Sequence, residues 1–383
     1  MRRRAFLAGS AAALAPSIAS AQLLPGGQLR QATIGVSVPM SGQFADYGKE
    51  VAKGVAAAID ETNRFNAPLT LAFGIRTFDD QNSGAIATAN VSIAAADPSI
   101  VAMVGNLTAD VTLQALPQYA NANFALMIPT ITADAVTARG YRNVFRLPTK
   151  DSTEGVLFAR TILPRHKTMS VIAVAVDGDY GGEVANGFVN QAKSDKHDAD
   201  AVILPAKFDP GAAAEALVKR KPDYIFLCGK VDRLGPFAQT LRTAGYKGDF
   251  GASDGFYTQT TIDKYASTLE GAVVASPFPP LDKAPSIFQL FNDFEHYAGS
   301  ITAFSAYGYA AAQLIIAAVR RSTTPTRFSV LTTLQQNGTY NTILGQYSFT
   351  FTGDAAVPNI YLYSAKSDGF AFVKAAVPTG FIV

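Results

Sequence analysis

Two patterns of hydrophobic and polar residues alternate along most of the chain. Short apolar runs predict buried β-strands, and they include ATIGVSV (32–38), IVAMVG (100–105), SVIAVAVD (170–177) and DYIFLCG (223–229). Between these runs, apolar residues recur every three or four positions, which predicts amphipathic helices such as the one at 46–63. Strands that alternate with helices indicate parallel sheets covered on both faces. The pattern therefore predicts an α/β fold.

Two such series follow one another, at residues 32–148 and 150–276. A long helical stretch comes next at 303–321, and the last apolar segments, YSFTF (347–351) and IYLYSAK (360–366), are typical of antiparallel strands. A chain of 383 residues exceeds the size at which one hydrophobic core usually divides. We therefore expect two similar α/β lobes, with a cleft between them that the chain crosses more than once.

Polar and aromatic residues occupy the loops after the predicted strands, where α/β sheets bind their ligands. Those of the first series contain Tyr47, Thr108, Ala109, Thr130 and Thr132, and those of the second contain Tyr180, Lys230 and Asp254. The first set includes the start of a helix, whose free N–H groups suit a carboxylate. The second set offers an aromatic ring, a cation and a carboxylate. Together the two sets predict a site for a zwitterionic small molecule.

The first 21 residues have the composition of an export signal. MRRR is a basic start, AFLAGSAAALAP is an apolar stretch, and Ala19-Ser20-Ala21 is a small-residue cleavage site. Arg3-Arg4 fits a twin-arginine signal, and an ordinary secretory signal is the alternative. Removal of three arginines changes the formal net charge from +2 to −1, which argues against a nucleic-acid partner. We expect a soluble periplasmic protein.

GASDG (251–255) matches the G-x-S-x-G pattern of serine hydrolases, which places a helix directly after the nucleophile. The next segment, FYTQTTIDKY, is rich in aromatic and β-branched residues and does not predict an immediate helix. Only His296 lies downstream, in an amphipathic pattern, and His166 and His197 are expected in solvent. Ser253 is therefore not favoured as a nucleophile, and no enzyme is predicted.

Neither a cofactor nor a metal ion is predicted. The chain contains no phosphate-binding loop, no dinucleotide fingerprint and no H-E-x-x-H motif, and three scattered histidines with one cysteine make a zinc site improbable. Cys228 lies in an apolar run and is expected to be a buried thiol. Asp79 and Asp80 are adjacent at the end of a strand and are expected to cap a loop.

Seven segments together point to a known family. They are IGVSVPMSGQFADYG, FDDQ, VGNLTADVT, MIPTITADAVTARGYRNVFRL, VDGDYGGEV, LRTAGYKGDFGASDG and YGYAAAQLIIAA. In this order, from about residue 32 to residue 365, the chain resembles the periplasmic solute-binding proteins of branched-chain amino-acid ABC transporters, the type I (leucine/isoleucine/valine-binding) family.

The resemblance implies two Rossmann-like lobes with parallel-sheet cores, joined by a three-segment hinge. Lobe 1 would comprise 32–148 and 279–350, and lobe 2 would comprise 151–276 and 354–383, with crossings near 148–151, 276–279 and 350–354. It also implies an exported monomer that captures a small amino acid or organic acid and presents it to a membrane permease. The alternatives are a sensory module that reports ligand occupancy to a receptor, and a secreted hydrolase that uses Ser253.

Position by position, the resemblance assigns a role to each predicted site residue. Members of this family bind the ligand carboxylate with the loops that match Thr108-Ala109 and Thr130 to Thr132, and the ligand ammonium with the acid that matches Asp254. Tyr47 and Tyr180 match aromatic residues of the cleft.

Two positions depart from the family pattern. Many members have serine where this chain has Ala109, so a carboxylate contact falls to backbone N–H or to Thr108. Lys230 stands where branched-chain amino-acid binders often have an aromatic residue. Its ammonium could meet a second carboxylate or an acid without an amine, or it could lean on Asp254 or point to solvent. The disulfide cysteines of the family are also missing.

Overall fold

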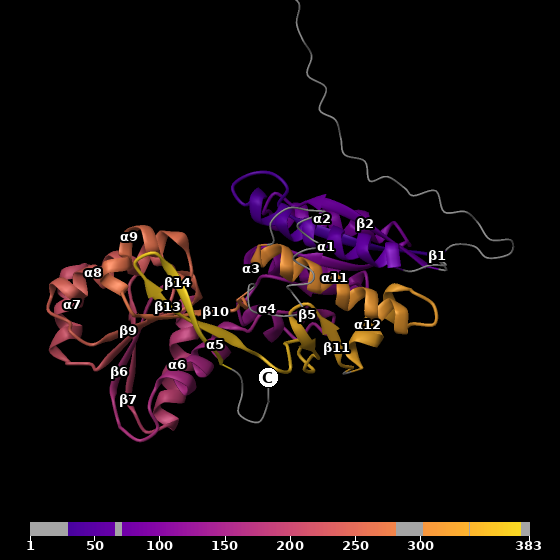
Figure 1. The fold of residues 1–383 in the computed structure, drawn as a ribbon. Helices are drawn as coiled ribbons and strands as arrows, with labels where there is room; N and C mark the ends of the chain where they lie inside the picture. The colour runs from indigo at the N-terminus through magenta and orange to yellow at the C-terminus, as the bar shows by residue number, and fades with distance from the viewer. Residues whose placement is uncertain (1–29, 66–70, 281–301, 337, 377–383) are drawn as a thin grey trace, which may run out of the picture.

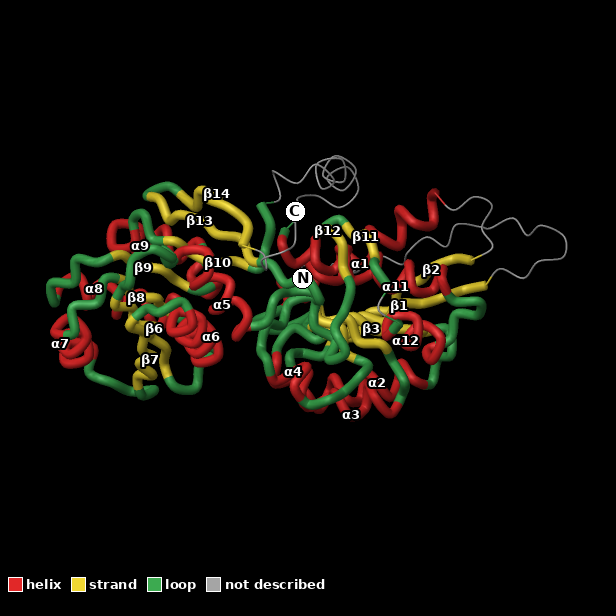
Figure 2. Tube along the Cα trace, turned by 90° about the horizontal axis from the view of Figure 1, so that it is seen from below, coloured by secondary structure: helices red, strands yellow, loops and turns green. Residues whose placement is uncertain are grey.

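The protein consists of two lobes that lie side by side in the computed structural model (Figure 1), which describes residues 30–65, 71–280, 302–336 and 338–376. Each lobe has a β-sheet with helices on both faces (Figure 2). The expected α/β class with parallel-sheet cores is therefore confirmed. The expected export signal at residues 1–21 lies outside the described residues.

The sheet of the first lobe has five parallel strands in the order β2-β1-β3-β4-β5. They are β1 (Arg30–Val38), β2 (Leu71–Asp79), β3 (Ile100–Gly105), β4 (Ala125–Ile128) and β5 (Val144–Arg146). The last three are buried along their whole length. Cover on both faces explains why their sequences are continuous apolar runs without alternation.

Two hydrophobic clusters attach helices to the opposite faces of this sheet. α1 (Ala45–Phe65), α11 (Ala303–Arg321) and α12 (Arg327–Gln335) share one cluster with Ile34 and Val36 of β1. α2 (Gly84–Ala95), α3 (Ala109–Asn121) and α4 (Ala135–Ala138) share the other with Met103 and Leu126. The late helices α11 and α12 thus complete a lobe that the chain began at its N-terminal end.

The sheet of the second lobe has the order β14-β13-β10-β9-β8-β6-β7. β6 (Ser170–Val176), β7 (Asp198–Leu204), β8 (Tyr224–Leu227), β9 (Asp249–Ala252) and β10 (Val273–Ser276) are parallel, whereas β13 (Ile360–Lys366) and β14 (Gly369–Ala376) add an antiparallel edge. α5 (Asp151–Ile162) and α6 (Gly181–Ser194) cover one face. α7 (Pro210–Lys219), α8 (Val231–Thr243) and α9 (Gln259–Leu269) cover the other.

Three connections between described elements join the lobes. The first connection, residues 147–150, leads from β5 into α5. The second leaves the second sheet after β10 and returns to the first lobe in α11. The third leads from the hairpin of β11 (Tyr340–Thr342) and β12 (Gly345–Tyr347) to β13. The first and third connections lie side by side, and the Thr149 hydroxyl of the first donates to the Asn359 carbonyl of the third at 2.6 Å. The middle connection includes 281–301, which lie outside the described residues.

One helix was missed, and one local expectation was wrong. The segment after Ser253 forms a 3₁₀ turn (Asp254–Phe256) and then α9, although its β-branched residues disfavour a helix. Burial of one helical face, including Ile262 and Leu269, overrides that propensity. His197 is buried rather than solvated, and its Nδ1 accepts from the Met169 N–H at 3.2 Å.

Other expectations about single residues are confirmed. Cys228 is a buried free thiol. Asp79 accepts from the N–H groups of Met40 and Gln81, and Asp80 accepts from that of Asn82, so both carboxylates order the loop at the end of β2. His166 is exposed, and His296 lies outside the described residues.

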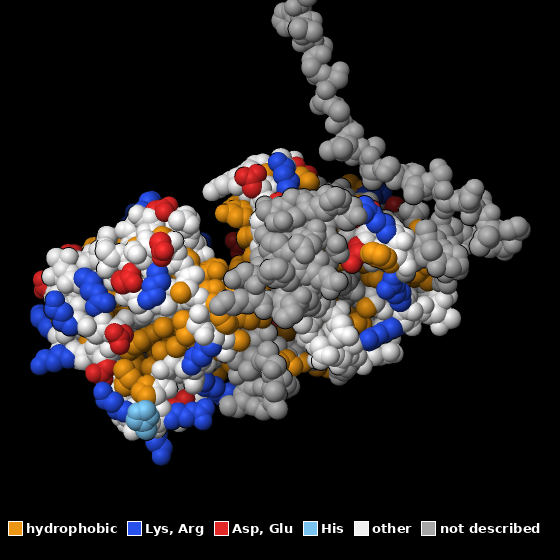
Figure 3. All heavy atoms as spheres, viewed as in Figure 1, with side chains coloured by type: hydrophobic (Ala, Val, Ile, Leu, Met, Phe, Trp, Pro, Cys, Tyr) orange, Lys and Arg blue, Asp and Glu red, His pale blue; other side chains and the backbone are white. Residues whose placement is uncertain are grey.

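The surface shows no large field of one charge on the face in Figure 3, where basic and acidic side chains are interspersed over the second lobe. Among the described residues, no helix is both long and apolar enough to cross a membrane. Within the same residues, no group of three histidine, cysteine or acidic side chains is arranged to hold a metal ion.

Candidate ligand site

The strands of both lobes direct their carboxyl-terminal loops toward one cavity of about 580 Å³. This volume lies within the roughly 300–1,000 Å³ of small-molecule sites. The first lobe contributes Tyr47 and Thr132, and the second contributes Tyr180, Lys230, Val231, Asp232, Asp254, Gly255, Thr258, Gln259 and Thr260. Five residues expected from the sequence therefore share the cavity: Tyr47, Thr132, Tyr180, Lys230 and Asp254.

The carboxylate of Asp254 is oriented by Tyr180. The tyrosine hydroxyl donates to Asp254 Oδ1 at 2.5 Å and accepts from the Gly255 N–H at 2.8 Å. Burial raises the pKa of the Asp254 carboxyl, and the hydrogen bond from Tyr180 opposes that rise. A carboxylate held in one orientation at the cavity wall suits a charge-assisted hydrogen bond to a ligand cation.

Ser253 has a structural position next to this carboxylate. Its side chain is fully buried, and its hydroxyl accepts from the Gly229 N–H at 2.9 Å and lies 3.1 Å from the Tyr180 hydroxyl. Of the described histidines, His197 contacts Met169 and His166 is exposed. The hydroxyl therefore joins the loops after β8 and β9 and has no histidine partner in the described part of the chain.

Lys230 lies at the wall of the cavity with its ammonium group toward solvent. Its side chain is 69% exposed, and Nζ lies 4.0 Å from Asp179 Oδ1. The Lys230 backbone N–H also donates to Asp179, whose carboxylate accepts from the Tyr180 N–H as well. The neighbour of Lys230 in this structure is therefore Asp179 and not Asp254.

The first lobe presents an aromatic ring and a loop to the cavity. Tyr47 is 48% exposed, and its ring packs on Phe304 of α11 with the ring centroids 4.8 Å apart. Thr132 lies in the loop after β4, and its carbonyl accepts from the Asp151 N–H at 3.0 Å. Because α5 belongs to the second lobe, this loop contacts both lobes beside the ligand cavity.

Thr108, Ala109 and Thr130 are not among the residues that line the cavity. Thr108 precedes α3 and donates its hydroxyl hydrogen bond to Asn82 Oδ1 at 2.8 Å, and Ala109 is the first residue of that helix. The Thr130 hydroxyl donates to the Leu107 carbonyl at 3.4 Å. The two loops expected to bind a carboxylate are therefore neighbours in the first lobe.

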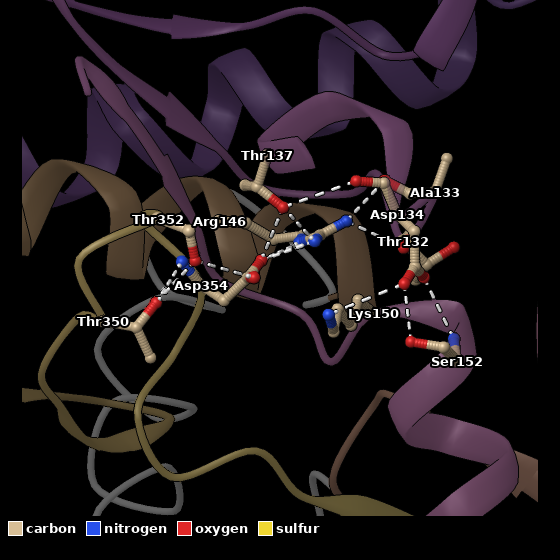
Figure 4. A network of polar contacts seen from close by, with 10 residues as sticks. All are labelled: Thr132, Ala133, Asp134, Thr137, Arg146, Lys150, Ser152, Thr350, Thr352 and Asp354. Atoms are coloured by element: carbon tan, nitrogen blue, oxygen red, sulfur yellow. Dashed lines mark hydrogen bonds and ion pairs between the residues drawn. The ribbon is translucent and has the colours of Figure 1, made fainter. Parts of the chain in front are cut away.

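A buried arginine supports the loop that carries Thr132 (Figure 4). Arg146 is fully buried, and its guanidinium donates to the carbonyls of Thr132 at 2.8 Å and Ala133 at 2.6 Å. The same guanidinium pairs with Asp354 of the third connection. Asp134 of this loop accepts from the backbone N–H of Ser152 at 3.0 Å, at the start of α5. The network ties the site to the third connection between the lobes.

Two further carboxyl groups lie behind Asp254, on the first turn of α5. Asp151 and Glu154 are each 1% exposed, and Glu154 Oε1 accepts from the Asp254 backbone N–H at 3.1 Å. Burial, with the nearby charge of Asp254, raises the pKa of Asp151 to about 8 and that of Glu154 well above its usual value. The region around the cavity is therefore rich in carboxyl groups.

Several cavity residues were missed by the sequence reasoning. Asp232, Thr258, Gln259 and Thr260 lie at the starts of α8 and α9. The helical spacing of the apolar residues Ile262, Tyr265 and Leu269 is the sequence signal that would have indicated α9. Asp151 and Glu154 stand in the first turn of α5, where acidic residues are common without any functional role, so no local pattern distinguished them.

Two parallel-sheet lobes that contribute facing residues to one cavity define a two-lobed solute-binding protein. The chain belongs to the periplasmic binding protein family, whose sequence model matches residues 31–370. The Leu/Ile/Val-binding protein homolog 1 of Brucella abortus is 24% identical over 334 residues, which cover 86% of this chain and 89% of that protein. The family resemblance noted in the sequence is confirmed.

Solved structures show the same fold. An ABC transporter substrate-binding protein from Desulfitobacterium hafniense in complex with Leu has a TM-score of 0.74 and 21% identity, over 90% of this chain and 100% of that chain. A solute-binding protein from R. palustris in complex with benzoate has a TM-score of 0.67 and 17% identity, over 91% and 97% of the two chains.

Proposed function

We propose that this protein is the substrate-binding subunit of an ABC importer and that it holds a small amino acid between its lobes. The observation that supports this function is the cavity in which Asp254 of the second lobe faces a wall containing Thr132 and Tyr47 of the first. Hinge closure would bring the two walls onto the ligand.

An ammonium group is the ligand feature that the acidic groups favour. Asp232 and Asp254 line the cavity, Asp151 and Glu154 lie behind it, and Lys230 is the one cation among the lining residues of the described cavity. Similar proteins bind chemically different acids, since one structure holds Leu and another holds benzoate. The surplus of carboxyl groups favours an amino acid over an aromatic acid for this chain.

The ligand carboxylate is assigned to the first lobe. Thr108 and Ala109 form the N-terminus of α3. The Thr130 hydroxyl donates to the Leu107 carbonyl just before that helix, and the loop that contains Thr130 continues to Thr132. The N-terminal N–H groups of a helix attract anions. In this arrangement Tyr47 and Tyr180 would cover the ligand between its charged ends, with Asp254 as the partner of the ammonium group.

Lys230 is assigned to the rim of the site. Its ammonium lies near Asp179 and is largely exposed, so it can screen the acidic cavity or contact a second ligand carboxylate at the mouth. Lys230→Ala should then weaken binding of dicarboxylic amino acids more than that of leucine. A uniform effect on both ligand types would contradict a specific role.

A binding experiment across ligand classes tests the function. We expect at least one α-amino acid, and no simple aromatic acid, to raise the melting temperature by mass action. Asp254→Asn should abolish the shift, because it removes the charge that meets the ammonium group. Asp232→Asn removes the same charge from an exposed lining residue and should retain most of the affinity. Equal loss in both variants would contradict the assignment of Asp254.

Export to the periplasm, a monomeric state and a permease partner complete the proposal. Cell fractionation and reconstitution of transport with the cognate permease test these points. A sensory module would bind the same ligand, but deleting it would change a receptor response and leave uptake intact.

We further infer that the protein does not catalyse a reaction. Ser253 lacks a contact with either described histidine, so Ser253→Ala should lower stability through the unpaired Gly229 N–H without changing reactivity toward serine-directed fluorophosphonates. Labelling of the wild type that disappears in this variant would favour the hydrolase alternative.

A further inference from the structure

Three carboxyl groups form a cluster at the back of the ligand cavity. Asp254 lines the cavity, Glu154 Oε1 accepts from the Asp254 backbone N–H at 3.1 Å, and Asp151 lies three residues before Glu154 on α5. Residues three apart on a helix are neighbours on its surface. Both α5 carboxyls are 1% exposed, so water screens their charges poorly.

One oxygen of the cluster has no partner. Oδ1 of Asp151 is buried without a hydrogen bond to any described residue. A buried, unpaired oxygen costs free energy as an anion, which favours a protonated cluster while the cavity holds no cation. The unpaired atom is a second sign, besides the proximity of the three groups, that the cluster is incomplete without a proton or a ligand cation.

Several other titratable or charged groups face the cluster. Tyr180 and Cys228 interact electrostatically with Glu154, Asp134 and Arg146 interact with Asp151, and Asp179 interacts with Asp254.

Arg146 is the one cation among these groups. Its guanidinium already binds Asp354 and two loop carbonyls. The Lys230 ammonium lies 4.0 Å from Asp179 and is largely exposed. No described cation is therefore committed to neutralising Glu154.

Burial and mutual repulsion favour protons on this cluster. Burial is the main reason that the pKa of Glu154 lies well above its usual value, and the charges of Asp254 and Asp151 add to the effect. The pKa of Asp254 is also raised, mainly by burial. Two coupled acids that resist simultaneous ionisation titrate as a pair.

We propose that Glu154 is a specificity-determining residue: it shares one proton with Asp254 while the cavity is empty, and a ligand ammonium group releases that proton on binding. The inference rests on the proposed function, because it places the ligand cation at Asp254. In the step, the O–H bond of the shared proton breaks and the proton passes to solvent. Asp254 then meets the ammonium group at the cavity wall, and the negative charge of the buried Glu154 carboxylate behind it adds to the attraction. A ligand without a cation cannot compensate the second negative charge and is disfavoured.

The sign of the pH dependence follows from this exchange. Within one pH window the empty protein binds one proton more than the complex. The lower limit of the window is the pKa of the pair in the complex, which the ligand cation lowers, and the upper limit is the raised pKa of the empty pair. Within that window, affinity for an amino acid increases with pH, by up to about tenfold per pH unit when one whole proton is released. Below the window the proton stays bound in both states, and the dependence disappears.

Carbon-13 NMR of the glutamate side-chain carboxyl groups tests the empty protein directly. Glu154→Gln identifies the Glu154 signal by its loss, while the amide oxygen keeps an acceptor for the Asp254 N–H. We expect this signal to titrate well above the usual range of a glutamate and to move to lower pH when leucine saturates the protein. Titration in the ordinary range in the empty protein would overturn the proposal.

Calorimetry then counts the protons. Leucine binding at near-neutral pH, measured in buffers of different ionisation enthalpy, should release up to one proton in the wild type and none in Glu154→Gln. Glu215→Gln, an exposed glutamate on α7, is the control and should release as many protons as the wild type. Equal proton release in wild type and Glu154→Gln would refute the shared proton. If no amino acid binds while Glu154 still titrates high, the proposed function fails and the shared proton stands.

Discussion

The buried pair of Arg146 and Asp354 gives a quantitative prediction for Asp354→Asn. The arginine side chain is fully buried, the aspartate side chain is 17% exposed, and Nε donates to Asp354 Oδ1 at 2.9 Å. The substitution keeps the shape of the residue but leaves the guanidinium without its countercharge. Breaking one partner of a buried pair typically costs about 3–5 kcal/mol.

The rest of the network reduces that cost. The guanidinium keeps its hydrogen bonds to the carbonyls of Thr132 and Ala133 and to the Thr137 hydroxyl at 2.7 Å. We therefore expect the lower end of the range, about 3 kcal/mol. In a lobe of this size that corresponds to a fall in Tm of about 6–12 °C.

Urea denaturation and thermal melting measure the effect, with a matched surface pair as control. Arg220 and Asp200 form a salt bridge of 2.8 Å whose side chains are 43% and 52% exposed. Asp200→Asn should cost less than about 1 kcal/mol, because water already screens that pair. A loss below about 1 kcal/mol in Asp354→Asn as well would refute the view that the Arg146–Asp354 pair is energetically buried.

Three further predictions address packing, pH and the site. Gly54→Ala should destabilise the protein by at least about 1–3 kcal/mol, because the new methyl group would lie 1.9 Å from a backbone carbonyl oxygen of α11. In Gly182→Ala the new methyl group meets nothing within 4 Å, so this control should not be destabilised. The urea midpoints of the two variants measure the difference. Burial raises the pKa of Asp151 to about 8, so the folded state binds more protons than the unfolded state between about pH 4 and pH 8. The free energy of unfolding should therefore fall as pH rises through that range. Asp151→Asn should flatten this pH dependence in a series of denaturation curves, and an unchanged dependence would contradict the shift. Tyr180→Phe removes the hydroxyl that donates to Asp254 and should weaken amino-acid binding by about tenfold in calorimetry, consistent with loss of a hydrogen bond to a charged group; unaltered affinity would show that the hydroxyl does not orient the carboxylate.

Much of the fold could be predicted from local patterns. The apolar runs at 100–105 and 170–176 form interior strands, because a strand covered on both faces needs apolar residues at every position. α9 was missed, since the β-branched residues of 259–269 have low helix propensity and only burial against the second sheet makes the helix favourable.

The candidate site was partly predictable for a topological reason. Parallel strands end at the same edge of a sheet, so residues that follow such strands gather there without any further information. Tyr180, Lys230 and Asp254 reach the cavity in this way. Thr108 does not line it, because its hydroxyl bonds Asn82. The partner of Lys230 was left open by the sequence and proves to be Asp179.

By itself, the amino-acid sequence determined the alternation of strands and helices, the parallel cores of the sheets and the loops that carry the candidate ligand site, because each depends on short-range periodicity. Only the tertiary structure decided that Tyr180 orients Asp254 across 74 positions and that Glu154 lies behind it across 100 positions. Such contacts depend on how α5 and the second sheet pack together. Burial and the charges of neighbouring carboxyl groups arise from that packing, and they change the chemistry of side chains that look ordinary in the sequence.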